Sequence, residues 1–467
     1  MADEDMWRPP ANRLMRTLDR SAFQRSVDLK AARVWENKNI FRVRAALERS
    51  KDALVKERLG SVHPDPDPSR AQNGKKCILL RPEALPDVDL AAHPHGTGPH
   101  SSTVAELASQ GLLSVIPFQL KLDYSYWTYH DIISAILPED EQGEIPSGFS
   151  QVGHVAHLNL RDDYLQYKYL IAEILMDKNA GVRTVINKID DVGEESEYRT
   201  FQYEVLAGPD DMKVTISEEN CTFKFDYSKV YWNSRLNTEH RRLVSLFHEG
   251  EAVCDVMAGI GPFAVPAGKR NIFTWANDLN PDSYECLRDA ISRNRVQDYV
   301  RPFNEDGRTF IRRAVREVAT SEHIVHVTKK RHSRKDVGAK PQVLKTLRHP
   351  RTFQHFVMNL PATAISFLPS FIGLYPPQLR QLLGADLHMP LIHVYCFSTK
   401  SDNNVKEGLE IATEISRQLE TDLKPGKIED GNVQIYDVRD VAPKKRMFCA
   451  TFRLPEEVAF RQLDVRS

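Results

Sequence analysis

A short apolar run that ends in a glycine turn constrains the fold of this chain more than any other stretch. Residues 252–257 (Ala-Val-Cys-Asp-Val-Met) have the length and β-branched content of a buried strand. A helix is expected from Phe263 onward. Gly259 and Gly261 lack side chains, so the backbone between strand and helix can turn tightly and approach a ligand closely. The pattern predicts an open α/β sheet that binds a ligand near Asp255, although a tight turn without a ligand would also need both glycines.

A second strand ends in an acid at the spacing of a ribose-binding carboxylate. Residues 274–277 precede Asp278, which lies about 20 residues after the glycines. Such a carboxylate accepts hydrogen bonds from ribose hydroxyls. Asn280 and Pro281 then separate the strand from a periodic stretch, 282–294, that predicts a helix. A ligand containing a nucleoside is therefore favoured.

The glycine turn also distinguishes between two such ligands. With Ala264 in the third place, it meets the dinucleotide pattern only in the looser Gly-x-Gly-x-x-Ala form. Pro262 has no N–H to donate to a pyrophosphate at the helix start. S-adenosylmethionine has a ribose and an amino-acid end but no phosphate, and it fits this turn better than NAD.

Two further strands end in side chains suited to a ligand. The third predicted strand runs into Asp306 and Gly307, and the fourth ends at Asn359-Leu-Pro361. An amide shortly before a proline resembles the acceptor-base arrangement of amino-methylating enzymes, although Asn-Leu-Pro alone could simply end a strand. The remaining elements complete a Rossmann-like order: strands at 300–310, 353–361, 391–397 and 448–453, and a helix at 404–419.

Length and composition indicate several domains and no global affinity for nucleic acid. A chain of 467 residues predicts two to four domains, and its net charge of -1 means that any nucleic-acid binding is local. No apolar run approaches the ~20 residues that span a bilayer, so no membrane association is expected. Six cysteines without a Cys-x-x-Cys pair indicate a reducing compartment. His93, His95 and His100 fall in a Gly- and Pro-rich loop, and no metal is expected.

The predicted elements group into four segments. Residues 1–75 are expected to be an amino-terminal extension, with a helix at 40–59 and a proline-rich linker at 61–69. The other segments are a small α/β module at 76–145, a middle α+β domain at 146–245, and the Rossmann-like domain at 246–467. A basic insertion at 323–351 is either a solvated loop or a phosphate-contacting segment.

The amino terminus leaves the compartment open. Met1-Ala-Asp-Glu-Asp is acidic and typical of a cytosolic protein. A start at Met6 would place an arginine-rich, acid-poor stretch, 6–23, first, which is the composition of a mitochondrial presequence and also of a solvated basic arm. We expect the protein in the cytoplasm and nucleus, with a pool in the mitochondrial matrix.

Five motifs together resemble the archaeal and eukaryotic tRNA guanine-37 N1-methyltransferases, which are class I methyltransferases. They lie at 148–161, 198–208, 230–240, 255–263 and 358–364, and the resemblance extends over about 146–453. It implies a Rossmann-like methyltransferase domain preceded by smaller α+β domains that bind tRNA. It also implies a monomer that methylates N1 of guanosine 37 with S-adenosylmethionine, supporting reading-frame maintenance and the first step toward wybutosine.

The resemblance assigns roles to individual residues. Glu239 is implied as the general base, Arg199 as the residue facing guanine O6, and Asn359 as the guanine anchor. Two further sets are implied: His240, Asp278, Leu279, Asp306, Gly307 and Asn359, with Gly259 and Gly261, at the methyl donor, and Tyr231, Arg235 and Pro361 at the guanine.

The chemistry needs these residue types. Guanine N1 is a poor nucleophile until its proton leaves, and a carboxylate is a weak base for so weak an acid. A guanidinium at O6 would stabilise the developing negative charge, and the base must leave its stack to reach the methyl group. Ordinary roles remain open: Glu239 could serve the helix dipole and Arg199 could be a surface residue. The alternative functions are an aminocarboxypropyl transferase of wybutosine synthesis and a non-catalytic tRNA-binding protein.

Overall fold

The computed structural model describes residues 6–82, 101–146, 148–189, 201–328 and 342–462, which form two compact units. Unit 1 comprises Met1–Gly148 and Leu160–Ala180, and unit 2 comprises Phe149–Asn159 and Gly181–Ser467. The segment expected as one middle domain, 146–245, is therefore divided between the two units. None of the described helices is both long and apolar enough to cross a bilayer.

Unit 1 is built on an antiparallel four-stranded sheet in the order β2-β3-β1-β4. Strand β1 pairs with β4 over ten residues, from Arg25↔Leu122 to Val34↔Leu113. Its elements are β1 (Arg25–Val34), α2 (Ile40–Arg49), β2 (Val62–Pro64), α3 (Pro68–Gln72), β3 (Lys76–Leu79), α4 (Ser102–Ser109), β4 (Leu113–Leu122), α5 (Tyr129–Ile136) and α6 (Lys168–Lys178).

Two predictions in unit 1 are wrong. The proline-rich stretch is not a linker, because Pro64 ends the edge strand β2 and Pro68 opens α3, where a missing N–H costs nothing. The helix predicted at 40–59 ends at Arg49, since Lys51 has φ +62° and turns the chain toward β3. Residues before 76 thus supply an inner strand and an edge strand of this sheet.

Unit 2 contains a seven-stranded sheet in the order β13-β12-β11-β16-β17-β19-β18. The first five strands are mutually parallel, and β19 pairs antiparallel with both of its neighbours. The strands are β11 (Ala252–Asp255), β12 (Phe273–Asn277), β13 (Val300–Phe303), β16 (His355–Met358), β17 (Leu391–Thr399), β18 (Gln434–Ala442) and β19 (Lys445–Arg453). The strand order reverses between β11 and β16, which is where open α/β sheets bind ligands.

Helices cover both faces of this sheet. Strand residues alternate between the faces, so Val253, Val357 and Tyr395 pack on one side and Phe356 and Val394 on the other. The helices are α7 (Asn237–Ser245), α8 (Ala264–Lys269) and α9 (Pro281–Asn294) on the first side, and α10 (Gly307–Val318), the 3₁₀ helix η8 (Ala364–Phe371), α11 (Pro377–Leu383) and α12 (Val405–Leu419) on the second, with α13 (Glu456–Ala459). The predicted Rossmann-like order is confirmed.

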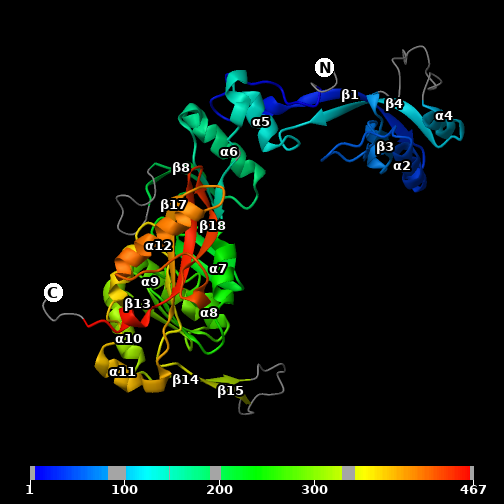
Figure 1. Cartoon of the computed structure of the whole chain (residues 1–467). Helices are drawn as coiled ribbons and strands as arrows, with labels where there is room; N and C mark the ends of the chain where they lie inside the picture. Colours follow the sequence, from blue (N-terminus) through cyan, green and yellow to red (C-terminus); the bar gives the residue numbers. More distant parts are fainter. Residues whose placement is uncertain (1–5, 83–100, 147, 190–200, 329–341, 463–467) are drawn as a thin grey trace. The chain divides into compact units, whose positions relative to one another are not determined.

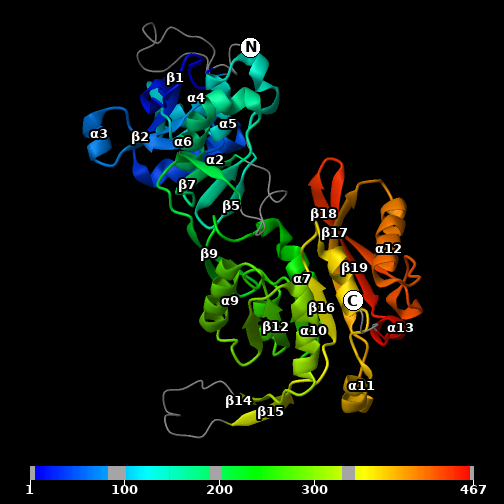
Figure 2. The ribbon, with the colours of Figure 1, turned by 90° about the vertical axis from the view of Figure 1, so that its left-hand side faces the viewer.

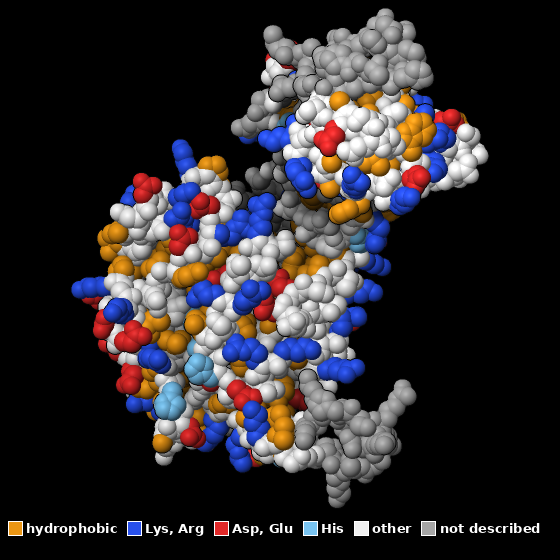
Figure 3. All heavy atoms as spheres, turned by 90° about the vertical axis from the view of Figure 1, so that its right-hand side faces the viewer, with side chains coloured by type: hydrophobic (Ala, Val, Ile, Leu, Met, Phe, Trp, Pro, Cys, Tyr) orange, Lys and Arg blue, Asp and Glu red, His pale blue; other side chains and the backbone are white. Residues whose placement is uncertain are grey.

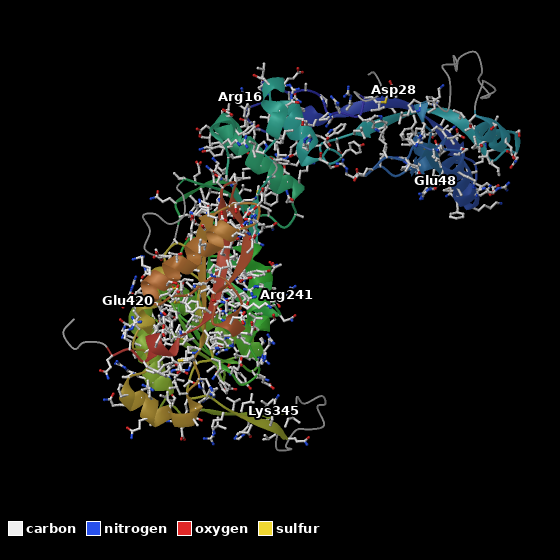
Figure 4. The ribbon with its side chains drawn as sticks, viewed as in Figure 1. Arg16, Asp28, Glu48, Arg241, Lys345 and Glu420 are labelled. Carbon is white, nitrogen blue, oxygen red and sulfur yellow. The ribbon has the colours of Figure 1, made fainter. Side chains whose placement is uncertain are left out.

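Three smaller sheets complete unit 2. They are β5-β6-β7-β8, β9–β10, and the ribbon β14–β15, which stands off the body in Figure 2. Their bounds are β5 (Ser150–Val152), β6 (Val155–Leu158), β7 (Thr184–Lys188), β8 (Tyr203–Ala207), β9 (Lys213–Glu218), β10 (Cys221–Asp226), β14 (Ile324–Thr328) and β15 (Val343–Arg348). The basic insertion is therefore a β-ribbon at its base, with Lys345 on β15 labelled in Figure 4. On the face shown in Figure 3, basic side chains are interspersed with acidic ones.

Candidate active site

A pocket lies at the reversal of strand order, against the carboxyl ends of β11, β12 and β16. Its wall comes from the glycine turn, the ends of neighbouring strands and the segment before α7. The lining residues are Tyr231, Trp232, Asn233, Leu236, His240, Val256, Met257, Ala258, Gly259, Ile260, Pro262, Phe263, Asn277, Asp278, Leu279, Asn280, Ser283, Asp306, Gly307, Asn359, Leu360 and Phe367. The successive strand ends therefore do converge on one cavity.

The turn needs glycine at 259 and at 261 for two different physical reasons. Gly259 lines the pocket at φ +56°, and a Cβ there would meet no atom within 4 Å. Gly261, at φ +94°, does not line the pocket; a Cβ would lie 2.7 Å from Leu287 Cδ1 and 2.9 Å from Val265 Cγ2. Gly259 thus leaves space for a ligand, whereas Gly261 permits the helix α9 to pack on the turn.

Asp278 ties the second strand end to the glycine turn. Its Oδ2 accepts a hydrogen bond from Gly259 N at 2.8 Å, and its Oδ1 accepts one from Asn280 N at 3.0 Å. Burial raises the pKa of Asp278. Burial, with the neighbouring Asp278 charge, also raises the pKa of Asp255 well above its usual range. Leu279, 44% exposed, offers an apolar side chain in the same wall.

The third strand end meets the pocket through a helix cap. Asp306 Oδ1 accepts hydrogen bonds from Arg308 N at 2.9 Å and Thr309 N at 3.2 Å, so it caps α10. Gly307 allows close packing, since a Cβ there would lie 3.0 Å from Val256 Cγ1 and 3.2 Å from Phe367 Cε1.

Asn359 brings an unused acceptor to the fourth strand end. Its Oδ1 is buried without a hydrogen-bond partner among the described residues, and the side chain lines the pocket. A buried amide oxygen without a partner costs free energy unless a ligand donates to it. This atom is therefore suited to an N–H of a bound molecule.

Glu239 lies behind the pocket wall rather than in it. It occupies the first turn of α7, is 4% exposed, and does not line the cavity. Arg242 donates from Nε to Oε2 and from Nη2 to Oε1, each at 2.6 Å. The Tyr395 hydroxyl donates to Oε1 at 2.6 Å. Three hydrogen bonds from these two residues thus hold the carboxylate in one orientation. Helix α7 begins at Asn237, directly after the 3₁₀ helix η6 (Ser234–Leu236).

His240, the next residue, does line the pocket. Its Nδ1 lies 2.6 Å from Glu218 Oε1 on β9, and its ring packs edge-on against Phe263 with centroids 4.9 Å apart. The Glu218 carboxylate accepts a hydrogen bond from the His240 Nδ1–H, and this bond fixes the orientation of the ring. Arg241, labelled in Figure 4, is exposed on the same helix and pairs with Glu219.

The residues predicted at the guanine do not all line the pocket. Tyr231 lines the pocket and is 40% exposed. Arg235 is exposed, and Pro361 is buried and accepts a hydrogen bond from Phe397 N at 3.2 Å; neither lines the pocket. Arg199 and the histidines at 93, 95 and 100 lie outside the described residues. Within the described ranges, no cluster of three or more His, Cys, Asp or Glu could hold a metal.

Sequence reasoning missed four groups around the site. Arg242 stands three residues after Glu239 on a predicted helix, a spacing that could have identified the pair. Tyr395 is 156 residues from Glu239 and Glu218 is on an unpredicted strand, so no local pattern points to either. The fourth is Asn277, which connects two segments below the pocket, because its Nδ2 donates to the carbonyls of Val256 and Glu305.

Known proteins match this chain over nearly its whole length. A family model described as TYW2 N-terminal domain matches residues 129–211, and one described as TRM5/TYW2 methyltransferase domain matches 215–334. A tRNA (guanine(37)-N(1))-methyltransferase of Fusarium vanettenii is 49% identical, covering 98% of both chains. One of Neurospora crassa is 51% identical, covering 95% of this chain and 93% of the other. The fold is similar to that of Trm5b from Pyrococcus abyssi, with a TM-score of 0.55 and 20% identity over 91% of this chain and 99% of the other.

Proposed function

The chain belongs to the family of tRNA (guanine(37)-N(1))-methyltransferases, and we propose from that membership how its pocket methylates guanosine 37. The protein transfers a methyl group to N1 of this nucleotide in tRNA. One observation carries the residue assignment: Asn359, whose buried Oδ1 has no hydrogen-bond partner among the described residues, lines the same cavity as the hydrogen-bonded Asp278 and Gly259.

S-adenosylmethionine is the proposed methyl donor, and it supplies an electrophilic methyl group on sulfur when bound. Asp278 would accept hydrogen bonds from its ribose, Leu279 would cover its adenine, and Gly259 leaves room beside it. The open space at Gly259 and the absence of an N–H at Pro262 both suit a ligand without phosphate.

Asn359 and Glu239 are proposed to act on the guanine. Asn359 Oδ1 would accept an N–H from the guanine edge and hold N1 toward the donor. Glu239, held by Arg242, would take the N1 proton as the nitrogen attacks. Because Glu239 is 4% exposed, this transfer requires its surroundings to open when tRNA binds. Tyr231 at the mouth would cover the base, and Arg199 would donate to O6.

Methyl transfer is tested directly with purified protein, tRNA carrying guanosine 37, and methyl-labelled S-adenosylmethionine. The expected product is N1-methylguanosine, identified by nucleoside mass. An aminocarboxypropyl adduct has a much larger mass and would assign the protein to wybutosine synthesis. Failure of label to enter tRNA would leave only a binding role.

Location and assembly complete the proposal. We propose a monomer in the cytoplasm and nucleus with a mitochondrial matrix pool, whose product supports reading-frame maintenance and precedes wybutosine. The arginine-rich stretch is part of unit 1, where Asn12 N donates to the carbonyl of Ala135 on α5 at 2.8 Å. Carboxyl-terminally tagged chains that begin at Met1 or Met6 would be compared by cell fractionation. If neither chain is recovered in the mitochondrial fraction, the proposed mitochondrial pool is ruled out.

A further inference from the structure

Tyr395 is a fully buried tyrosine whose hydroxyl is directed at Glu239. It lies on β17, and its hydroxyl donates to Glu239 Oε1 at 2.6 Å. Its ring packs against Phe263 with centroids 6.0 Å apart. Burial, foremost, raises the pKa of Tyr395 well above its usual range, so the hydroxyl keeps its proton and acts as a donor.

Arg242 adds a charged contact to Glu239, but it does not fix the carboxylate relative to the sheet. Its guanidinium binds both Glu239 oxygens, and it lies over the Tyr436 ring at 4.0 Å. Arg242 is only three residues from Glu239 on α7, so the two move together with that helix. Tyr395 comes from the central sheet, and it connects the carboxylate to a different element.

The sheet also relates Tyr395 to Asn359. Strands β16 and β17 are parallel neighbours in which Met358 pairs with Val394. Asn359 follows Met358 directly after the end of β16, and Tyr395 follows Val394 within β17. The hydroxyl of Tyr395 therefore links the proposed base to the backbone frame that carries the proposed guanine anchor.

We propose that Tyr395 is a positioning residue for methyl transfer, holding the Glu239 carboxylate in one orientation and in register with Asn359. The inference rests on the proposed role of Glu239 as the base. Loss of this donor removes a hydrogen bond that stabilises the charged form of the carboxylate. It also frees the carboxylate to rotate away from the position set by the sheet.

The test substitutes Tyr395→Phe in the full chain, with Tyr375→Phe as the matched control. Tyr375 is also fully buried in unit 2, but its hydroxyl has no hydrogen-bond partner among the described residues. For Tyr395→Phe we expect kcat to fall about tenfold, as for loss of a hydrogen bond to a charged group. The acid limb of the kcat–pH profile should move to higher pH, while KM for tRNA and for S-adenosylmethionine stays within about twofold. Tyr375→Phe should change neither.

A second variant keeps the test open if Tyr395→Phe folds poorly. Replacing Tyr395 with 3-fluorotyrosine retains the ring and makes the hydroxyl a stronger donor, so the acid limb should move to lower pH. An unmoved limb in a folded variant, with Glu239→Gln inactive, overturns the role of Tyr395 and leaves the base assignment intact. Full activity of Glu239→Gln would instead remove the base assignment itself.

Discussion

The carboxylate of Asp278, at the end of β12, accepts a 2.8 Å hydrogen bond from the backbone N–H of Gly259 in the turn after β11. The same carboxylate receives Asn280 N on its other oxygen. One acid thus fixes the shapes of both turns that form the donor side of the pocket. Its effect on ligand binding is therefore expected to exceed that of a single contact.

Asp278→Ala should weaken S-adenosylmethionine binding by about 10- to 100-fold, because hydrogen bonds to a charged group contribute about 1.5–3 kcal/mol. Calorimetric titration of the free enzyme measures this directly. Asp289→Asn is the control, since Asp289 is exposed and pairs with Arg293 on α9. Equal affinities of the two variants would contradict a role of Asp278 at the donor.

The two glycines should separate binding from stability. Gly261→Ala places a Cβ 2.7 Å from Leu287 Cδ1 at a positive φ, so thermal unfolding should occur several degrees lower. In Gly259→Ala the new Cβ meets no atom within 4 Å, so stability should fall by only about 1 kcal/mol. This variant should weaken donor binding more than Gly261→Ala does. Calorimetric scans and titrations on both variants check the contrast. A larger loss of stability in Gly259→Ala than in Gly261→Ala would contradict these roles of the two glycines.

Glu239→Gln should lower kcat at least about 100-fold while sparing donor affinity, as expected for loss of a general base. Single-turnover methylation at saturating tRNA measures the chemical step. Glu285→Gln, at an exposed position of α9 beside Arg288, serves as the control. A near-normal rate for Glu239→Gln would show that another group takes the N1 proton.

His349 should make unit 2 less stable in mild acid. Burial, foremost, lowers the pKa of His349 to about 4, and its Nε2 accepts the Trp275 indole N–H at 3.1 Å. An unfolded histidine titrates near about 6.5, so the unfolded chain binds the extra proton between those values. The stabilisation is complete above the unfolded pKa and is lost as pH falls, by about 1.4 kcal/mol per unit.

Chemical denaturation at several pH values between 7.5 and 5 measures this slope. His349→Gln should be less stable at pH 7.5 but should show a shallower decline than the unmodified chain. His388→Gln changes an exposed histidine and should preserve the full slope. Parallel declines for all three proteins would assign the acid sensitivity to other groups.

Local patterns predicted the two strands beside the glycine turn well. The strand before Gly259 and the strand before Asp278 each carry their own signals in apolar runs and turn residues, and both form where expected. Proline position was misjudged at Pro64 and Pro68, because an edge strand and a first helical residue both tolerate a missing N–H.

The surroundings of the proposed base could not be predicted in the same way. The Glu239–Tyr395 contact joins residues 156 positions apart, and it depends on how α7 packs on the sheet. Strand β18 was also missed; its residues are mostly exposed or half-buried, so hydrophobic periodicity marks it weakly. Tertiary packing decides both features.

Strand β19 lies between β17 and β18, although it is the last of the three in the chain. Its Met447 and Cys449 pack in the same cluster as Tyr395 and Phe263. During synthesis on the ribosome, the donor side can therefore assemble while β17 still has an open edge. A message cut short before codon 445 would yield a chain that keeps the glycine turn, Arg242 and Tyr395 but lacks the strand that packs against Tyr395. Its β17 edge would be unpaired and prone to association.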